Sequence, residues 1–195
     1  MPNLYGRRPL PRSFYERDTV SVARDLLGTV VVHGPVAGRI VETEAYLGAD
    51  DEAAHSFAGL TPRTRVIFGP PGRAYVYFTY GMHYCLNLVA EPEGRPGCVL
   101  LRALEPLAGV EEMFRRRPKA RRETDLCSGP AKLTQALDVG LELYGADVTR
   151  GPLTVHPPAA SDSFEIVVSP RIGITRSAAL PLRFFIRDNE HVSRR

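Results

Sequence analysis

The sequence predicts an α+β fold: one domain built on a largely antiparallel mixed sheet, with flanking helices and a protruding β-hairpin. Strand-like segments dominate, and the helical segments neither alternate with them nor repeat at a regular interval. The 17 prolines and 17 glycines fall mainly between these segments. A chain of 195 residues with 44% hydrophobic content can bury one good-sized core. We therefore assign residues 1–195 to a single domain, and expect about the first 12 residues to form a flexible arm.

The N-terminal half supplies a helix, two strands and a second, brief helix. Asp18 is expected to cap a helix in "TVSVARDLLG", because its side chain can accept hydrogen bonds from the free amides of the first turn. Strands are predicted on either side of the His-Gly-Pro turn at 33–35, in "TVVV" and "RIVETEAYL". Thr61 as a cap and Pro62 at the first helical position predict a brief helix that Gly69 ends.

The C-terminal half supplies the hairpin and the remaining elements. The segment "AYVYFTYGMHYCLNLVAE" predicts two strands joined by a tip at residues 80–83, and "GCVLLRALEPL" predicts a buried strand. A helix capped by Ser128 is predicted in "SGPAKLTQAL", and late strands are predicted in "EIVVSPRIGIT" and "LPLRFFIRD". Residues 156–164, "HPPAASDSF", predict a surface connection.

The sequence indicates the cellular compartment of the protein and the state of its cysteines. No stretch approaches the roughly 20 apolar residues of a membrane span, and the N-terminus lacks the apolar core of a signal peptide. We therefore expect a soluble, cytoplasmic protein. Cys85, Cys98 and Cys127 are odd in number and lack CxxC spacing, which predicts buried reduced thiols in place of disulfides or a zinc site.

Charge is unevenly distributed along a chain whose net charge is +3. Residues 42–52 carry five acids, whereas residues 115–122, "RRRPKARR", carry six bases. Such a basic run is either a solvated loop or a contact with a polyanion such as nucleic acid. In "CSGPAKL", Ser128 and Lys132 at a helix start either serve the helix itself or bind phosphate.

Two acids stand side by side in the strand predicted over residues 39–47. A period of two puts Glu42, Glu44 and Tyr46 on one face, with the carboxylates about 7 Å apart. Such carboxylates repel unless a cation compensates them, and Arg102, embedded in the apolar run "VLLRALEP", is the candidate. The carboxylates could serve as a general base toward water or as the acid and base of sugar hydrolysis. The alternative is an edge strand with a solvated polar face.

A further polar cluster, "GADDEAAHS", contains Asp50, Asp51, Glu52 and His55. These side chains could bind a metal ion and serve a metal-dependent hydrolase. However, the three acids resemble the first turn of a helix, where acids interact favourably with the macrodipole. A lone histidine is more often structural than a ligand, so we predict no metal site.

The predicted hairpin is rich in tyrosine. Tyr75 and Tyr77 share one face, and packing alone would explain them. Tyr80, beside a glycine at the tip, predicts an exposed wedge that enters between stacked bases. Tyr46, Tyr77 and His55 could form the flat walls that sandwich a planar ring.

The segments "RIVETEAYLGADDEAAHS", "YVYFTYGMHYCLNL", "CVLLRALEPL" and "CSGPAKL" occur in this order. Together they closely resemble the alkyladenine (3-methyladenine) DNA glycosylase family, and the resemblance runs from about Phe14 to Arg187. It implies a single domain whose inserted β-hairpin intercalates into DNA. It also implies a monofunctional DNA glycosylase of base excision repair. Such an enzyme flips alkylated or deaminated purines out of duplex DNA and hydrolyses the N-glycosidic bond, leaving an abasic site.

The resemblance assigns roles to individual residues. It implies that Glu44 activates the attacking water, that Arg102 helps to position this water, and that Glu42 has a supporting role. The base pocket that it implies is lined by Tyr46, His55, Tyr77 and Asn87, and Asn87 screens against the guanine amino group. Tyr80 becomes the intercalating residue. Apart from the resemblance, the helix start and the basic run lead us to expect contacts to the DNA backbone from Ser128, Lys132, Arg115, Arg116 and Arg117.

With this chemistry we expect no cofactor, no metal and no membrane association. The expected partner is double-stranded DNA that contains damaged purines, and we expect a monomer of prokaryotic type in the cytoplasm, associated with the nucleoid. The residues leave two other classes open: a metal-dependent hydrolase that uses the cluster at 50–55, and a nucleic-acid-binding module without catalysis. The motifs do not choose among 3-methyladenine, 7-methylguanine, hypoxanthine and ethenoadenine as the preferred lesion.

Overall fold

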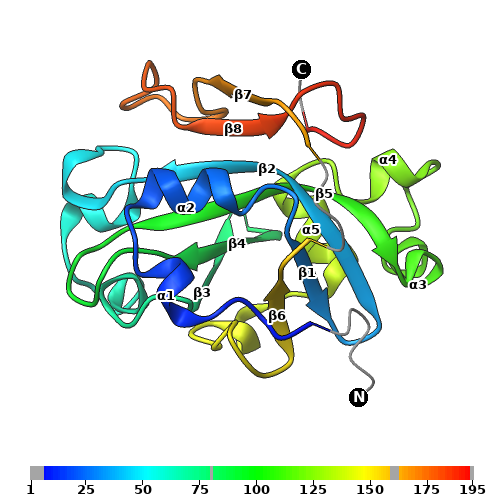
Figure 1. The fold of residues 1–195 in the computed structure, drawn as a ribbon, viewed down its shortest axis with the longest axis horizontal. Helices are drawn as coiled ribbons and strands as arrows, with labels where there is room; N and C mark the ends of the chain where they lie inside the picture. Colours follow the sequence, from blue (N-terminus) through cyan, green and yellow to red (C-terminus); the bar gives the residue numbers. More distant parts are fainter. Residues whose placement is uncertain (1–6, 80, 159–162, 194–195) are drawn as a thin grey trace.

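An antiparallel sheet forms the centre of the molecule (Figure 1). The computed structural model describes residues 7–79, 81–158 and 163–193. Its strands are β1 (Val30–His33), β2 (Val36–Tyr46), β3 (Ala74–Thr79), β4 (His83–Val89), β5 (Cys98–Ala108), β6 (Leu153–His156), β7 (Ile166–Ser169) and β8 (Arg183–Ile186). They pair in the order β3-β4-β5-β2-β1-β6, and β8 pairs with both β2 and β7. Every pairing among these described strands is antiparallel, in agreement with the predicted α+β fold.

Strand β2 has several partners, because its length lets different stretches pair with different strands. Its start folds back on β1, its full length follows β5, and its stretch from Glu42 to Glu44 also pairs with β8. In Figure 1, β7 and β8 lie above β2. The stretch with the two acids is therefore interior to the sheet, and the edge-strand interpretation is wrong.

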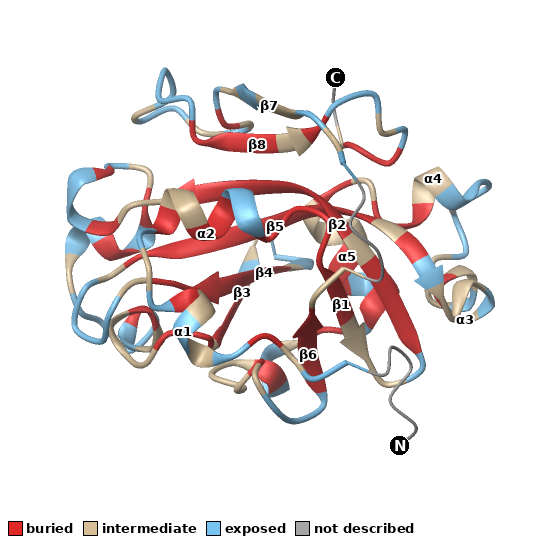
Figure 2. Cartoon of the chain, viewed as in Figure 1, coloured by how far each residue is buried: buried red, intermediate tan, exposed pale blue. Residues whose placement is uncertain are grey.

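Two helices cover the sheet and build much of the core. Helix α2 (Thr19–Asp25) packs against β2 and β5, and helix α5 (Pro130–Leu137) packs against β4 and β5. Thr43 alternates with Glu42 and Glu44 along β2, and its hydroxyl donates to the Ala23 carbonyl of α2 at 2.8 Å. Strands β2 and β5 are buried along most of their length (Figure 2). The helix α2 thus occupies one face of β2, and the two acids project from the other.

Of the three predicted helix caps, that of Asp18 is confirmed and those of Thr61 and Ser128 are wrong. Thr64, and not Thr61, stands at the start of the short helix that follows Thr61. The Asp18 carboxylate accepts from the Ser21 amide at 2.9 Å, which confirms the cap of α2. The predicted Ser128 cap of α5 is wrong, because the cap position is occupied by Gly129, which has no side chain to accept a hydrogen bond. Ser128 Oγ instead accepts from Lys132 Nζ at 3.1 Å. Pro130 begins the helix, and it has no amide that a cap would need to satisfy.

The remaining elements are short. The helix predicted over 61–69 is reduced to the 3₁₀ turn η3 (Arg65–Phe68), preceded by a turn in which Thr61 Oγ1 accepts from the Thr64 amide at 3.2 Å. The other short elements are α1 (Arg12–Tyr15), η1 (Gly48–Asp50), η2 (His55–Ala58), α3 (Val110–Arg116), α4 (Glu123–Leu126) and η4 (Leu141–Leu143).

The first described residues already contact the sheet. The Leu10 amide donates to the Val155 carbonyl of β6 at 2.7 Å, whereas residues 1–6 of the predicted arm lie outside the described residues. Tyr80 and residues 159–162 of the predicted surface connection also lie outside them. The three cysteines are buried and free, as predicted. Among the described residues, no helix is long and apolar enough to cross a membrane.

Candidate active site

Two buried carboxylates of β2 share one arginine of β5. Glu42 and Glu44 have no exposed surface, and Arg102 is 6% exposed. Arg102 Nε donates to Glu42 Oε1 at 2.9 Å, and Arg102 Nη1 lies 3.2 Å from Glu44 Oε1. Desolvation acts to lower the pKa of Arg102, but the charges of Glu44 and Glu42 outweigh it and raise this pKa. The predicted compensation of the two acids by Arg102 is therefore confirmed.

Glu42 is surrounded by further donors. Its Oε1 atom accepts from Arg183 Nε at 2.7 Å and from Ser193 Oγ at 2.9 Å, and its Oε2 atom accepts from the Ser193 amide at 2.7 Å. Arg102 Nη2 also donates to Ser193 Oγ at 3.3 Å. Glu42 therefore joins β5, β8 and the C-terminal segment, a supporting position that keeps the Arg102 guanidinium in place.

Glu44 has fewer donors, and they are unequally shared between its oxygens. Its Oε1 atom accepts from the Ile172 amide at 2.8 Å and faces Arg102, whereas its Oε2 atom accepts from the Tyr46 hydroxyl at 3.0 Å. A carboxylate oxygen can accept two hydrogen bonds, so Oε2 keeps one acceptor position beside Tyr46. Burial of the hydroxyl, and then the Glu44 charge, raise the pKa of Tyr46, which keeps this hydroxyl a donor.

A second buried ion pair supports the same region. Arg171 and Asp51 form a bidentate pair at 2.5 and 2.7 Å, and both side chains are fully buried. Arg171 Nη1 also donates to the Ala45 carbonyl at 2.9 Å, and its guanidinium carbon lies 4.5 Å from the centre of the Tyr46 ring. The pair therefore holds both Tyr46 and the loop whose Ile172 amide contacts Glu44.

The Asp51–Arg171 pair was missed by the sequence analysis. The helix-turn interpretation of the acids at 50–52 is wrong for Asp51, because η1 ends at Asp50 and Asp51 is extended. The Asp51 carboxylate instead accepts from the Leu47 amide and the Ala53 amide as well as from Arg171. One signal was present, since Arg171 follows the apolar run "EIVVSP", where a charge needs a partner.

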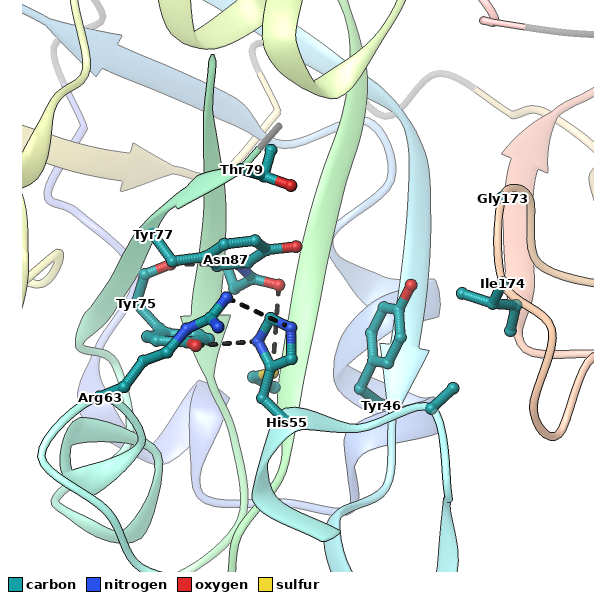
Figure 3. Close-up of a pocket in the computed structure, with 11 residues that line it drawn as sticks. Tyr46, His55, Arg63, Tyr75, Tyr77, Thr79, Asn87, Gly173 and Ile174 are labelled. Carbon is teal, nitrogen blue, oxygen red and sulfur yellow. Dashed lines mark hydrogen bonds between the residues drawn. The ribbon is translucent and has the colours of Figure 1, made fainter. Parts of the chain in front are cut away.

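A cavity of about 200 Å³ opens beside Tyr46. Figure 3 shows Tyr46 on one side of this space, with His55 and Tyr77 on the other. The rings of His55 and Tyr77 meet edge to face, with centroids 4.6 Å apart. Asn87 also lines the cavity and is buried, and its Nδ2 atom donates to the Tyr75 carbonyl at 3.1 Å. The fold thus brings together the four side chains predicted to line a base pocket.

His55 has a neighbour at each ring nitrogen. Its Nδ1 atom lies 2.9 Å from the Tyr75 hydroxyl, and its Nε2 atom lies 3.4 Å from Arg63 Nη2. Because a guanidinium can only donate, this contact favours the tautomer with an unprotonated Nε2. Partial desolvation, followed by the Arg63 charge, lowers the pKa of His55 to about 4. No cluster of three or more potential metal-binding residues occurs within the described ranges.

The side chains predicted to contact the DNA backbone form hydrogen bonds and an ion pair within the protein. Arg115 pairs with Glu112, Arg116 Nη1 donates to the Ala136 carbonyl, and Arg117 Nη1 donates to Gln135 Oε1. The contacts of Arg116 and Arg117 connect the end of α3 to α5, whereas the pair of Arg115 and Glu112 lies within α3. Lys132 donates to Ser128 Oγ near the start of α5. Tyr80, the predicted intercalating residue, lies outside the described residues.

The chain matches one family and is similar to several named relatives. The sequence model of the family described as Methylpurine-DNA glycosylase (MPG) matches residues 13–190. A protein of Methanoculleus marisnigri named "Putative 3-methyladenine DNA glycosylase" is 52% identical over 196 residues, which cover 95% of this chain and 99% of that protein. Proteins with the same name from Chlorobaculum parvum and Methanocella arvoryzae are 49% and 50% identical. Their alignments cover 94% and 95% of this chain, and 90% and 96% of those proteins.

The role of Glu42 can be tested by removing its charge. Glu42→Gln keeps the size of the side chain but removes the negative charge that pairs with the buried guanidiniums of Arg102 and Arg183. Removing one partner of a buried pair costs about 3–5 kcal/mol, so we expect the free energy of unfolding in urea to fall by that order. Glu112→Gln is the control, because Glu112 pairs with Arg115 at the surface, and its loss should be much smaller. Equal losses in the two variants would contradict the structural role of Glu42.

The protonation of His55 can be followed by NMR of its ring nitrogens. We expect the ring to stay neutral as the pH falls from 7 to about 5, because its pKa is near 4. Since this value lies below the unfolded pKa of about 6.5, protons favour the unfolded chain and stability falls as the pH drops through this window. Arg63→Gln should raise the pKa only partway, because desolvation is the larger cause. Titration near pH 6.5 in the wild-type protein would contradict the assignment.

Proposed function

This chain belongs to the methylpurine-DNA glycosylase family and is a DNA glycosylase, and on that premise we propose its reaction in detail. It flips alkylated or deaminated purines out of duplex DNA and hydrolyses the N-glycosidic bond, which leaves an abasic site for base excision repair. One observation carries the proposal: Glu44, a buried carboxylate with one open acceptor position, lies behind Tyr46 at a cavity with aromatic walls.

The attacking water is proposed to occupy the open acceptor position on Glu44 Oε2. Cleavage of an N-glycosidic bond develops positive charge on the sugar, which a nearby carboxylate stabilises while it orients the water and takes its proton. Arg102 has five N–H donors, and its described contacts engage Nε and one N–H on each Nη atom. The remaining donors are available to position the same water. Because Tyr46 separates Glu44 from the cavity, a shift of its hydroxyl would admit the water.

The cavity is proposed to hold the flipped purine. A purine has two flat faces, which suit stacking between Tyr46 on one side and the rings of His55 and Tyr77 on the other. Asn87 is proposed to exclude guanine, because its Nδ2 atom is engaged by the Tyr75 carbonyl and its position is therefore fixed. A fixed amide cannot withdraw from the additional amino group of guanine, so unmodified guanine is disfavoured. 7-Methylguanine carries the same amino group, but its positive charge weakens the N-glycosidic bond and offsets the poorer fit.

The hairpin of β3 and β4 is proposed to enter the minor groove, with Tyr80 as the wedge that fills the gap left by the flipped nucleotide. Ser128, Lys132 and the arginines at 115–117 are proposed to contact the flanking phosphates. The protein is proposed to act as a monomer in the cytoplasm, on DNA of the nucleoid. Neither a metal nor a cofactor has a part in this chemistry.

The two alternative classes make different predictions. A metal-dependent hydrolase would need the acids and histidine of residues 50–55, but Asp51 is paired with Arg171, and both ring nitrogens of His55 have neighbours. A binding module without catalysis would recognise damaged DNA and release no base. Release of free base in the presence of excess chelator therefore separates the proposed function from both alternatives.

The catalytic role is tested with Glu44→Gln in single-turnover reactions on duplexes that contain one damaged purine. We expect the variant to retain lesion binding and to lose base release, because an amide cannot take a proton from water. Excision within about tenfold of wild type, a barrier change of only ~1.4 kcal/mol, would contradict the assignment. Glu165→Gln serves as the matched surface control, because Glu165 is exposed and its partner Arg187 is not among the proposed DNA contacts. The product strand should remain uncut, because neither of the two lysines, Lys119 and Lys132, lines the cavity where an amine would have to attack the sugar.

The backbone contacts are tested by the salt dependence of DNA affinity. We expect Lys132→Gln to lower the slope of log affinity against log salt by about one, and joint replacement of Arg115, Arg116 and Arg117 to lower it further. Thermal denaturation must accompany the second measurement, because Arg116 and Arg117 also join α3 to α5. If neither replacement changes the slope, the basic run is a solvated surface.

A further inference from the structure

Arg63 brings a positive charge to the wall of the base cavity. It lies in the loop before η3, and its side chain extends toward His55 and Tyr77 (Figure 3). Its guanidinium carbon lies 5.0 Å from the centre of the Tyr77 ring, and its Nη2 atom lies 3.4 Å from His55 Nε2. The guanidinium therefore contacts the two side chains proposed to stack on one face of the flipped purine.

The backbone beneath this charge is held in place. The Tyr144 hydroxyl lies 3.2 Å from the Arg63 carbonyl and 3.4 Å from the Pro62 carbonyl. The next residue, Thr64, is buried, and its hydroxyl donates to the Gly59 carbonyl at 3.0 Å. The backbone position is therefore fixed, whereas the Arg63 side chain is exposed and reaches the cavity wall through its contacts with His55 and Tyr77.

No acidic side chain among the described residues of the cavity lining neutralises the charge of Arg63. Among these described residues, Arg63 is the one with a permanent charge. The nearby acids Glu44 and Asp51 are engaged by Arg102 and Arg171 respectively. His55 cannot act as a proton donor through Nε2, since that atom faces a donor of Arg63. The space proposed for the base is therefore electropositive and lacks an acid at this wall.

We propose that Arg63 is a specificity-determining residue that favours purines leaving as anions, such as hypoxanthine, over purines that carry positive charge, such as 7-methylguanine. This inference rests on the proposed function. When the C1′–N9 bond of a neutral lesion breaks, its electron pair stays on the purine, which departs as a monoanion. The water oxygen bonds to C1′ and its proton passes to Glu44, and the anion later takes a proton from solvent. A guanidinium beside the stacking rings stabilises this anion.

A cationic lesion responds differently to the same charge. 7-Methylguanine in DNA is already positive, and breakage of its C1′–N9 bond leaves a neutral base. Arg63 therefore has no anion to stabilise, and it opposes binding of the charged lesion. Loss of the residue should therefore slow excision of the two substrate classes unequally, which a general structural role would not do.

The test compares two duplexes on each enzyme preparation, one with hypoxanthine and one with 7-methylguanine, under single-turnover conditions at saturating enzyme. We expect Arg63→Gln to slow hypoxanthine excision by about tenfold or more, which corresponds to ~1.4 kcal/mol, and to change 7-methylguanine excision less than about threefold. Arg63→Lys keeps the charge and should retain most of the preference. Arg65→Gln removes the same charge two residues away, outside the cavity lining, and should alter neither rate.

The ratio of the two rates decides the outcome. An unchanged ratio in Arg63→Gln, whether both rates fall or neither does, would overturn the inference. Reaction amplitudes give the active fraction, so partial misfolding lowers amplitudes without altering the ratio of rates. If Arg63→Gln does not fold, Arg63→Met supplies the uncharged variant for the same comparison. If the wild-type protein releases neither base, the proposed function fails, and that result is distinct from failure of the role of Arg63.

Discussion

Three carboxylates are buried in the part of the chain that the structure describes, and the need to pair each of them sets the arrangement of the strands and loops around β2. Glu42, Glu44 and Asp51 have no exposed surface, and an unpaired charge in the interior costs several kcal/mol. Each carboxylate must therefore meet a guanidinium, and these come from separate parts of the chain: Arg102 in β5, Arg171 in the loop before β8, and Arg183 in β8. A different order of strands around β2 would leave buried charges without partners. The site and the fold are consequently stabilised by the same contacts.

The C-terminal segment belongs to this charge network. The family match ends at residue 190, but the Ser193 amide and hydroxyl both donate to Glu42. Val192 is buried beside it, which ties the segment to the core. Arg102 Nη2 donates to the same Ser193 hydroxyl. Docking of the chain end is thus coupled to the orientation of the arginine that faces Glu44.

Glu42 and Glu44 share a residue type, a strand and an arginine, and their surroundings give them different capacities. Glu42 accepts from two guanidiniums and from an amide and a hydroxyl of Ser193, which leaves it a structural anion. Glu44 accepts from one amide and one tyrosine hydroxyl and faces one guanidinium, so it keeps an acceptor position beside Tyr46. Two like carboxylates assume different roles when the environment supplies unequal numbers of donors. In the cavity lining, likewise, His55 is neutral because its surroundings lower its pKa, whereas Arg63 keeps its charge.

Features that depend on short-range physics could be predicted from the sequence. Period-two alternation placed Glu42 and Glu44 on one face, the Asp18 cap marked the start of α2, and the tyrosine-rich run predicted the hairpin of β3 and β4. Arg102 was also predictable, because a charge inside an apolar strand requires a partner nearby. The pairing of distant groups became evident only from the three-dimensional structure: Asp51 meets Arg171, 120 residues away, and Ser193 meets Glu42, 151 residues away. Such pairs depend on where loops pack, and no local steric or hydrogen-bonding preference specifies that.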